Sequence, residues 1–270
     1  MAKKEKAYIS DARGGSRRAR HSFKERRQAI GPSLSFGAAE AYKLLRTNVM
    51  FSMSDEAQCK VIGVTSSLRG EGKSTTSVNF AYTLSESNKN VLLIEADMRI
   101  PVMANLFELN QTAGLSNVLA GLSNINDVLM KTPIGTHLYI LPAGEIPPNP
   151  SELISSRRME MLVTSLSKSF DYIVIDLPPV NAVSDSLAVS KLLTGMVVVV
   201  RQDYCDRYAL AEAMRQLSFL NVKVLGFVVN DAYGEGGHYG KYYRSKGRYY
   251  KKDYYTKGYG ESANNAAKGD

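Results

Sequence analysis

Residues 67–74 read Ser-Leu-Arg-Gly-Glu-Gly-Lys-Ser and decide the fold, because they directly follow the apolar run 61–64 and precede a helical stretch. Strand, glycine-containing loop and helix in this order are typical of a phosphate-binding loop. Glycines there let backbone N–H groups turn inward around phosphate oxygens, where side chains would collide. The lysine supplies a positive charge to the terminal phosphates, and the serine hydroxyl is a ligand for Mg²⁺. The sequence therefore predicts an ATP or GTP site built from Gly70, Glu71, Gly72, Lys73, Ser74 and Thr75.

A cluster of tyrosines is the second informative feature. Residues 233–259 contain nine tyrosines, whereas the other 243 residues contain seven. The clustered tyrosines are interleaved with Gly, Lys and Arg and follow neither a helix nor a strand period, so they have no core to enter. Beside a predicted nucleotide site, such a tail suggests a kinase together with its own substrate. The phosphoacceptors that we expect are Tyr239, Tyr242, Tyr243, Tyr249, Tyr250, Tyr254, Tyr255 and Tyr259.

The positive charge of the chain belongs to its two ends. The 270 residues have a formal net charge of +8 and are 44% hydrophobic, which allows one sizeable core. Residues 1–33 carry ten Lys or Arg against three acids, residues 234–270 carry eight against four, and the segment between them carries sixteen against nineteen. We therefore expect a basic flexible tail over 1–34, a kinase domain over 35–232 and a flexible tyrosine-rich tail over 233–270. The simplest interpretation of the first tail is a solvated segment, and the alternative is attraction to an anionic membrane or an acidic partner.

Cysteine usage and hydropathy indicate the compartment. Cys59 and Cys205 lack metal-like spacing, which favours free thiols in a reducing environment. The N-terminal residues are charged and include no apolar segment of the kind found in a signal peptide. The longest apolar run, 196–200, is far too short to span a bilayer. We expect a cytoplasmic protein that reaches the inner face of the plasma membrane through a partner.

Short apolar runs alternate with longer segments of helical period. Most runs are rich in Val, Ile and Leu without polar alternation, as in strands that are buried on both faces of a sheet. This order predicts an α/β fold, doubly wound around a mostly parallel sheet, with the active site at the carboxyl ends of the strands. The predicted strands are 60–65, 90–95, 138–142, 171–176, 196–201 and 222–230, and the predicted helices are 38–52, 73–87, 151–169, 182–193 and 207–220.

Acidic residues stand at two of the predicted strand ends. One apolar run leads into Glu95 and Asp97, and another leads into Asp176. A carboxylate at the tip of a buried strand is costly unless it meets a cation or water. An exposed strand-end acid is a common alternative for any one of them, but three acids beside a predicted phosphate loop favour Mg²⁺ binding. Arg99, two positions beyond Asp97, is a candidate for contacting the phosphates or the acceptor, and equally for a surface salt bridge.

Three motifs carry a resemblance to a known family. They are the loop Ser-Leu-Arg-Gly-Glu-Gly-Lys-Ser-Thr (67–75), the run Leu-Leu-Ile-Glu-Ala-Asp-Met-Arg-Ile-Pro (92–101) and the run Ile-Val-Ile-Asp-Leu-Pro-Pro (173–179). With these motifs and the tyrosine cluster, the chain resembles the bacterial tyrosine kinases of capsular and exopolysaccharide biosynthesis. Shorter matches at 114–116, 141–144 and 147–153 extend the resemblance, which spans residues 35–260.

The resemblance implies an ATP- and Mg²⁺-dependent protein-tyrosine kinase that phosphorylates its own tail and regulates the synthesis or export of a polysaccharide. The second motif corresponds to the family's A′ motif, and the third supplies the other strand-end acid. The catalytic residues that the resemblance implies are Lys73, Asp97 and Asp176, and the metal ligands are Ser74, Asp97 and Asp176. Arg99 is added to the catalytic set from its position after Asp97.

Two positions depart from the family pattern. Glu95 stands where the family usually has Asp, so its longer side chain makes direct metal contact doubtful. Arg69 stands where the family often has Pro, which leaves the phosphate loop intact.

Residues Glu40, Lys43 and Arg46 are three positions apart on a predicted helix and therefore lie on one face. An ordinary ladder of salt bridges explains this spacing without any further role. In the family that the chain resembles, a Glu-x-x-Arg-x-x-Arg pattern at this place mediates assembly into rings. Lys43 replaces the first Arg and lacks its planar fork. The resemblance thus implies a homo-oligomeric ring with these three residues at the interface.

The resemblance also implies partners. A transmembrane activator, or polysaccharide co-polymerase, is expected as a separate protein, because this sequence shows no spanning segment of its own. A tyrosine phosphatase that reverses the modification is expected as well.

Two rival interpretations remain open. The partitioning-type ATPases share the predicted fold, but they normally carry a signature Lys near the start of the loop followed by Gly-Gly, where this chain has Leu68, Arg69 and Gly70. A nucleic-acid-binding protein would use the basic, Gly- and Tyr-rich tail to stack bases and attract phosphates. The catalytic motifs favour a kinase over both, and they disfavour nucleic acid as a partner.

Overall fold

The computed structural model describes residues 27, 29–53, 58–110 and 112–232. The chain divides into a unit over Met1–Asn230, to which every element named below belongs, and a unit over Asp231–Asp270. The predicted tail over 1–34 lies mostly outside the described residues. The predicted tail over 233–270, with all eight expected phosphoacceptors, lies wholly outside them.

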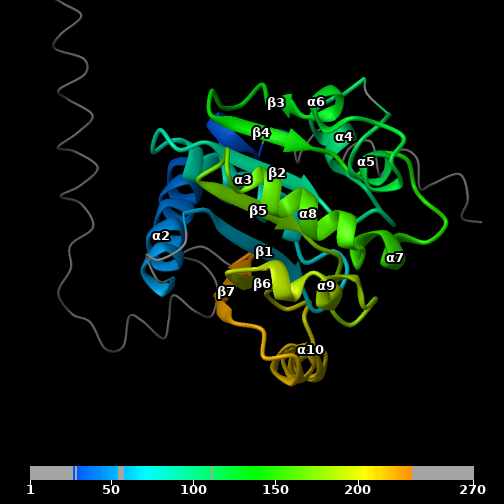
Figure 1. The fold of residues 1–270 in the computed structure, drawn as a ribbon. Helices are drawn as coiled ribbons and strands as arrows, with labels where there is room; N and C mark the ends of the chain where they lie inside the picture. The colour runs from blue at the N-terminus through cyan, green and yellow to red at the C-terminus, as the bar shows by residue number, and fades with distance from the viewer. Residues whose placement is uncertain (1–26, 28, 54–57, 111, 233–270) are drawn as a thin grey trace, which may run out of the picture. The chain divides into compact units, whose positions relative to one another are not determined.

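A seven-stranded sheet forms the centre of the first unit, in the order β3-β4-β2-β5-β1-β6-β7 (Figure 1). The strands from β4 to β7 in this order run parallel, and β3 pairs with β4 in the antiparallel direction. Strands β2 and β5 are buried at every residue, as expected for Val- and Ile-rich strands covered on both faces. The strands are β1 Lys60–Ser66, β2 Val91–Glu95, β3 Met130–Lys131, β4 Leu138–Leu141, β5 Tyr172–Asp176, β6 Gly195–Arg201 and β7 Val224–Asn230.

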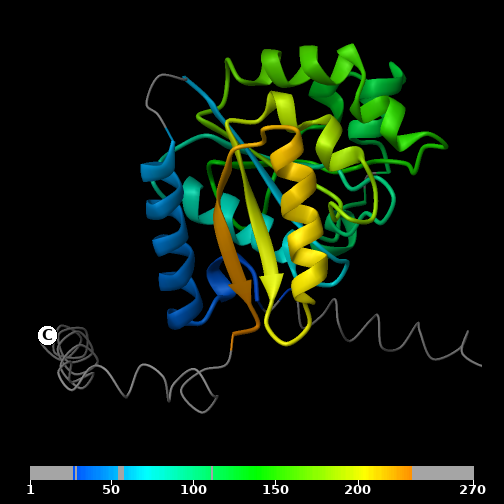
Figure 2. The same ribbon diagram turned by 90° about the horizontal axis from the view of Figure 1, so that it is seen from below.

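Helices pack on both faces of this sheet (Figures 1 and 2). One core contains buried residues of α2, α3 and α4, and the other contains buried residues of α5, α7, α8 and α10. The α-helices are α2 Phe36–Ser52, α3 Lys73–Ser85, α4 Met103–Leu106, α5 Leu115–Ala120, α6 Ile125–Val128, α7 Pro150–Ile154, α8 Arg157–Leu166, α9 Asp185–Ala188 and α10 Arg207–Phe219, and two 3₁₀ turns are η1 Gly31–Ser33 and η2 Ser190–Leu192.

This architecture confirms the predicted doubly wound α/β fold, whereas several element boundaries were wrong. The predicted helix 151–169 is two helices, α7 and α8, because the Ser156 side chain caps α8 by accepting a hydrogen bond from the Met159 N–H. The predicted helix 182–193 is the short α9 followed by η2. The sequence reading also missed β3, α4, α5 and α6, which are too short to show a clear period.

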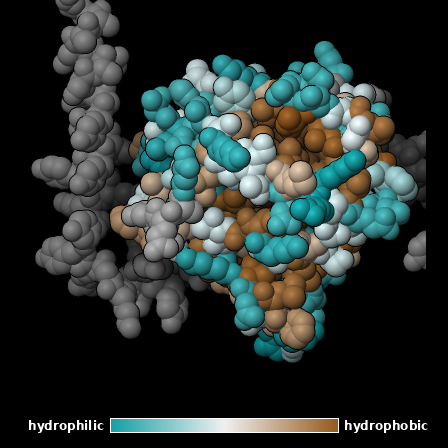
Figure 3. All heavy atoms as spheres, viewed as in Figure 1, coloured by the Kyte–Doolittle hydropathy of each residue, from teal (hydrophilic) through white to brown (hydrophobic). Residues whose placement is uncertain are grey.

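Hydrophobic residues reach the surface in two places on the face seen in Figure 3, near α5 and between α9 and α10. Hydrophilic side chains cover most of the remaining visible surface. None of the helices that the structure describes has the length and apolar character needed to cross a membrane.

A short segment before α2 packs on α3. Ile30 is buried, and the Asn79 side chain of α3 accepts a hydrogen bond from Gly31 N–H and donates one to the Ala29 carbonyl. Residues 29–34, which belong to the predicted N-terminal tail, are thus fixed to the domain at its amino-terminal end.

Candidate functional site

Three neighbouring parallel strands bring the sequence motifs together. In the register of the sheet, Asp176 of β5 lies beside Glu95 of β2 on one side and Val64 of β1 on the other. The phosphate loop begins where β1 ends, and Asp97 follows β2 by two residues. Residues far apart in the sequence therefore meet at the carboxyl edge of the sheet, where α/β proteins bind ligands.

The loop between β1 and α3 has the backbone conformation of a phosphate cradle. Gly70 and Gly72 have φ angles of +88° and +93°, which residues with a Cβ rarely adopt. Gly72 is the N-cap of α3 and has no side chain to cap the helix, so the first turn of α3 has the form of an anion-binding helix N-terminus. Glu71 contributes its backbone only, because its carboxylate turns into the protein and accepts a hydrogen bond of 2.7 Å from the Leu68 N–H.

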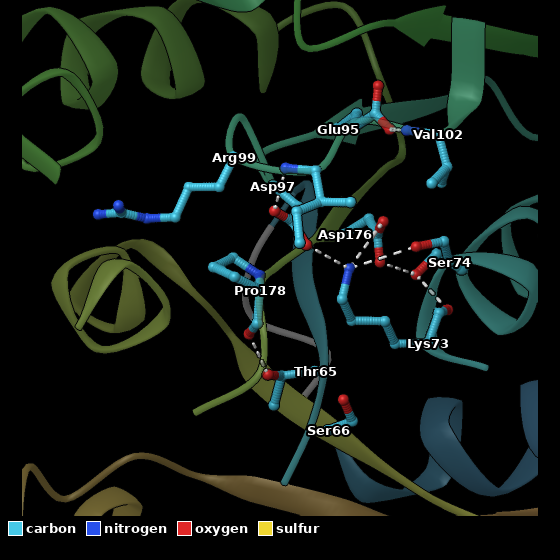
Figure 4. Close-up of polar contacts among 12 residues, drawn as sticks. Thr65, Ser66, Lys73, Ser74, Glu95, Asp97, Arg99, Val102, Asp176 and Pro178 are labelled. Atoms are coloured by element: carbon cyan, nitrogen blue, oxygen red, sulfur yellow. Dashed lines mark hydrogen bonds and ion pairs between the residues drawn. The ribbon is translucent and has the colours of Figure 1, made fainter. Parts of the chain in front are cut away.

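Lys73 lies between two carboxylates (Figure 4). Its Nζ is 2.9 Å from Asp97 Oδ2 and 3.4 Å from Asp176 Oδ2, and also 3.3 Å from the Ser74 hydroxyl. Burial opposes the charge of the ammonium, but the carboxylates of Asp176 and Asp97 outweigh it and raise the pKa of Lys73 above its ordinary value. The lysine thus carries its charge at neutral pH and holds the two acids together.

Asp176 is a fully buried acid at the end of β5. It is 0% exposed, and burial is the main cause that raises the pKa of its carboxyl above the ordinary value. The attraction of Lys73 and hydrogen bonds from Ser74 and Ser77 work in the opposite direction, with a distance of 3.0 Å from Ser77 Oγ to Asp176 Oδ1. Ser77, one turn after Lys73 on α3, is a contributor that the sequence reading missed.

The donor set fits Mg²⁺. Ser74, Asp97 and Asp176 present only oxygen atoms, which are the ligands that Mg²⁺ prefers together with water and phosphate. Within the described part of the chain there is no group of three or more His, Cys, Asp or Glu side chains arranged as a metal site. These residues would therefore hold Mg²⁺ jointly with nucleotide phosphates, the usual mode for this metal, rather than in a cage made by the protein alone.

Glu95 does not face the lysine (Figure 4). Its carboxylate accepts hydrogen bonds from the N–H groups of Val102, Met103 and Ala143, at 2.5, 2.8 and 3.1 Å. Complete burial outweighs these donors and raises the pKa of Glu95 to about 7. The Glu95 carboxylate therefore points away from the expected metal site. It links the segment after β2 to the segment after β4.

The raised pKa of Glu95 predicts a pH-dependent stability. The folded protein holds a proton on Glu95 below pH of about 7, whereas the unfolded chain releases it near 4.5, so stability falls as the pH rises between these values. Glu95→Gln cannot titrate. We expect the free energy of unfolding of wild type, relative to this variant, to fall by about 3 kcal/mol between pH 4.5 and 8. Urea unfolding at several pH values measures it, and parallel profiles for the two proteins would contradict the prediction.

Arg99 turns away from Lys73 in this structure (Figure 4). Its Nε donates to Asp185 Oδ2 at 2.9 Å, and its Nη2 donates to the Ser151 hydroxyl at 2.8 Å. The salt-bridge alternative is what the structure shows, although the partner carboxylate is buried rather than at the surface. Asp185 and Ser151 were not identified in the sequence, because Arg99 and Asp185 lie 86 positions apart.

The three predicted interface residues on α2 do not act as one ladder. Lys43 pairs with Glu40 at 2.9 Å, and both are partly exposed. Arg46 instead donates to the Thr83 carbonyl of α3 at 2.7 Å and to the hydroxyl of Ser87, just after that helix, at 2.8 Å. Within one subunit, Arg46 therefore fastens α2 to the helix that carries Lys73.

A parallel sheet, a glycine loop that opens a helix and strand-end carboxylates beside the loop lysine define a P-loop nucleotide-binding protein. Residues 59–223 match a family model described as "AAA domain". The chain is 35% identical over 206 residues to tyrosine-protein kinase YwqD of Bacillus subtilis, which covers 75% of this chain and 86% of that relative. It belongs to the bacterial protein-tyrosine kinase family and is a protein-tyrosine kinase.

Solved structures agree with this assignment. The kinase domain of the Escherichia coli tyrosine kinase ETK superposes with a TM-score of 0.70 at 29% identity, over 77% of this chain and 82% of that one. The chimerical protein CapA2B2 does so with a TM-score of 0.70 at 31% identity, over 79% and 91%. The septum site-determining protein MinD of Pyrococcus horikoshii, complexed with Mg-ADP, has a TM-score of 0.54 at 22% identity, over 63% and 70%, which shows the shared fold alone.

Proposed function

We propose that this kinase uses ATP and Mg²⁺ to phosphorylate tyrosines of its own C-terminal tail. The observation that carries the proposal is the position of Lys73, held between Asp97 and Asp176 at the start of α3. This arrangement collects in one place the parts that phosphoryl transfer needs: a phosphate loop, a positive charge and two carboxylates as oxygen donors for the metal.

Lys73 is expected to exchange partners when ATP binds. The phosphates then attract its ammonium, and Oδ2 of Asp97 loses the partner that it has at 2.9 Å. Oδ1 of Asp97 remains fixed, because it accepts a hydrogen bond of 3.2 Å from the Ile100 N–H. One carboxylate oxygen is thus anchored, and the other is freed to accept a hydrogen bond from the acceptor phenol.

Asp97 then orients the tyrosine and accepts its proton late in the reaction. A phenol has a pKa of about 10 and a carboxylate a pKa of about 4, so complete proton transfer before attack is unfavourable. A loose phosphoryl-transfer transition state needs little charge on the nucleophile at that stage, so positioning dominates. The bound metal would neutralise the charge that develops on the phosphate oxygens.

The tail suits the role of a substrate with a built-in switch. Residues 234–270 carry eight Lys or Arg and four acids, a net charge of +4, and each phosphotyrosine adds about −1.5 to −2. An unmodified tail is attracted to the acidic site of a neighbouring subunit, and a modified tail is repelled from it. We propose that the neighbouring subunit contacts α2 in a homo-oligomeric ring, with Glu40, Lys43 and Arg46 at the interface.

Light scattering tests the tail and the ring together. Wild type incubated with ATP and Mg²⁺ should incorporate phosphate. The mass of its oligomer should then decrease, because the repelled tails no longer link subunits. A variant with all eight phosphoacceptors from Tyr239 to Tyr259 changed to Phe should incorporate none and keep its mass, since each Phe lacks only the hydroxyl. Full phosphorylation without any change of mass, or phosphate on the Phe variant equal to wild type, would contradict the proposal.

We further propose that a membrane protein with a cytoplasmic segment activates the kinase, and that the pair regulates the synthesis or export of a capsular or exopolysaccharide, with a tyrosine phosphatase resetting the tail. Family membership supports this proposal. The rate of phosphotyrosine formation, measured with and without the partner's cytoplasmic segment, checks it, and equal rates would count against it.

A further inference from the structure

Three consecutive carbonyl groups of the phosphate loop are held from outside the loop. The carbonyl of Arg69 accepts a hydrogen bond of 2.9 Å from the Tyr204 hydroxyl, and the carbonyl of Glu71 accepts one of 2.9 Å from Asn230 Nδ2. Between them, Arg201 Nη1 reaches the Gly70 carbonyl at 3.5 Å. The donors come from the end of β6, the segment after it and the last residue of β7. We call Arg201, Tyr204 and Asn230 the brace.

Peptide geometry gives these contacts a consequence for ligand binding. In a planar trans peptide the carbonyl of one residue and the N–H of the next point in opposite directions. Carbonyl groups turned toward the brace therefore direct the N–H groups of Gly70, Glu71 and Gly72 away from it. A phosphate-binding loop needs its N–H groups to converge on an anion before the anion arrives. The brace thus fixes the orientation of the N–H groups that bind phosphate.

The brace is itself held in place. The Arg201 guanidinium lies over the Tyr204 ring, 5.3 Å from its centroid, and the Asn230 carbonyl accepts a hydrogen bond of 3.0 Å from the Gln202 N–H. Asn230 also touches the loop closely enough that a Cβ on Gly72 would collide with its Nδ2. The Glu71 carboxylate adds a buried link, accepting from the N–H groups of Leu68 at 2.7 Å and Arg201 at 3.4 Å.

We propose that Tyr204 and Asn230 are positioning residues that preorganise the phosphate loop for the phosphates of the nucleotide, with Arg201 supporting Tyr204. Neither needs to touch the nucleotide: each acts through a backbone carbonyl of the loop. The inference rests on the proposed nucleotide function and goes beyond it, because it assigns part of the phosphate affinity to residues about 130 to 160 positions away from the loop.

The test compares Tyr204→Phe and Asn230→Asp with wild type in binding two probes, Mg-ADP and inorganic tripolyphosphate, by titration calorimetry. Tyr204→Phe removes one hydroxyl donor, and Asn230→Asp turns a donor into an acceptor facing a carbonyl. We expect Kd to rise about fivefold for the first variant and about tenfold or more for the second, equally for both probes. The melting temperature without ligand should stay close to that of wild type.

Tyr208→Phe is the matched control. Arg207 lies over the Tyr208 ring at 4.6 Å and donates to its hydroxyl, which repeats the arginine–tyrosine pairing of the brace on an exposed part of α10. This variant should bind both probes like wild type.

The outcomes separate the possibilities. Wild-type affinities in both brace variants would overturn the inference and leave the kinase function standing. A loss of affinity for Mg-ADP alone, with the affinity for tripolyphosphate unchanged, would overturn the inference as well. Such a result would mean that these side chains contact the nucleoside. A wild-type protein that binds neither probe would overturn the nucleotide function itself and the inference with it.

Discussion

Asp97→Asn should lower the rate of tyrosine phosphorylation by roughly 10²- to 10⁴-fold. The amide keeps the size of the side chain and an oxygen for the Ile100 N–H, but it has no basic oxygen to accept the phenol proton and a weaker affinity for metal. The nucleotide loop is unchanged, so the Kd for ADP should move much less than the rate. Single-turnover phosphorylation and calorimetry on the same preparation measure both quantities.

Asp171→Asn is the control for this change. Asp171 directly precedes β5, at the opposite end of the strand from Asp176, and it also pairs with a lysine, Lys89, at 3.2 Å. A rate like that of wild type is expected for this control. Turnover like that of wild type in Asp97→Asn would remove Asp97 from the catalytic set, whereas an equal loss in both variants would indicate a general effect on the fold.

Lys73→Met should abolish phosphorylation and also destabilise the protein without nucleotide by about 3 kcal/mol at pH 7, because it leaves two enclosed carboxylates without their cation. Asp97 and Asp176 are 5% and 0% exposed, so water cannot replace the ammonium fully. Burial already raises the pKa of Asp176, and without the lysine it rises further in the folded state. Stability that depends on a raised carboxyl pKa is present at low pH and is lost as the pH rises, so the deficit should shrink toward pH 4.

Lys89→Met provides the comparison, since this lysine also pairs with an aspartate but is about half exposed. Exposed pairs contribute at most about 1 kcal/mol, so this variant should lose little at any pH. Urea unfolding of the two variants from pH 4 to 8 measures the difference. A deficit in Lys73→Met that is no larger than in Lys89→Met would show that the two acids do not depend on Lys73.

The fold class could be predicted from the sequence because strands that are buried in a parallel sheet consist of continuous apolar residues. The run before Asp176 and the run before Glu95 contain almost only Ile, Val and Leu, and both form strands within one residue of the predicted bounds. The predicted helix 151–169 was wrong because Ser156 caps a new helix within an otherwise helical pattern. Serine occurs both inside helices and at N-caps, so the sequence pattern alone does not distinguish the two cases.

The site could be located from the sequence because its central residues stand at strand ends and in the loop, positions that the topology of the sheet brings together. Lys73, Asp97 and Asp176 meet as the motifs indicate. The direction of each side chain could not be obtained this way. Glu95 and Arg99 belong to the same motif as Asp97, yet Glu95 is drawn to three backbone N–H groups and Arg99 to Asp185.

The brace residues could not be predicted from the sequence, for a different reason. Tyr204 and Asn230 donate to carbonyl groups of the loop, and a bond between a side chain and a distant backbone group leaves no pattern in one sequence. Their neighbours in sequence, an exposed turn and the end of an edge strand, gave no signal of function.

Mass spectrometry of the purified chain after incubation with ATP and Mg²⁺, beside Lys73→Met treated identically, tests the central claim most directly. The account predicts phosphotyrosine between Tyr239 and Tyr259 in wild type and none in the variant. Wild-type protein that binds Mg-ADP but acquires no phosphotyrosine in this segment, even with an activating cytoplasmic segment present, would contradict the claim that the tail is the substrate of this kinase.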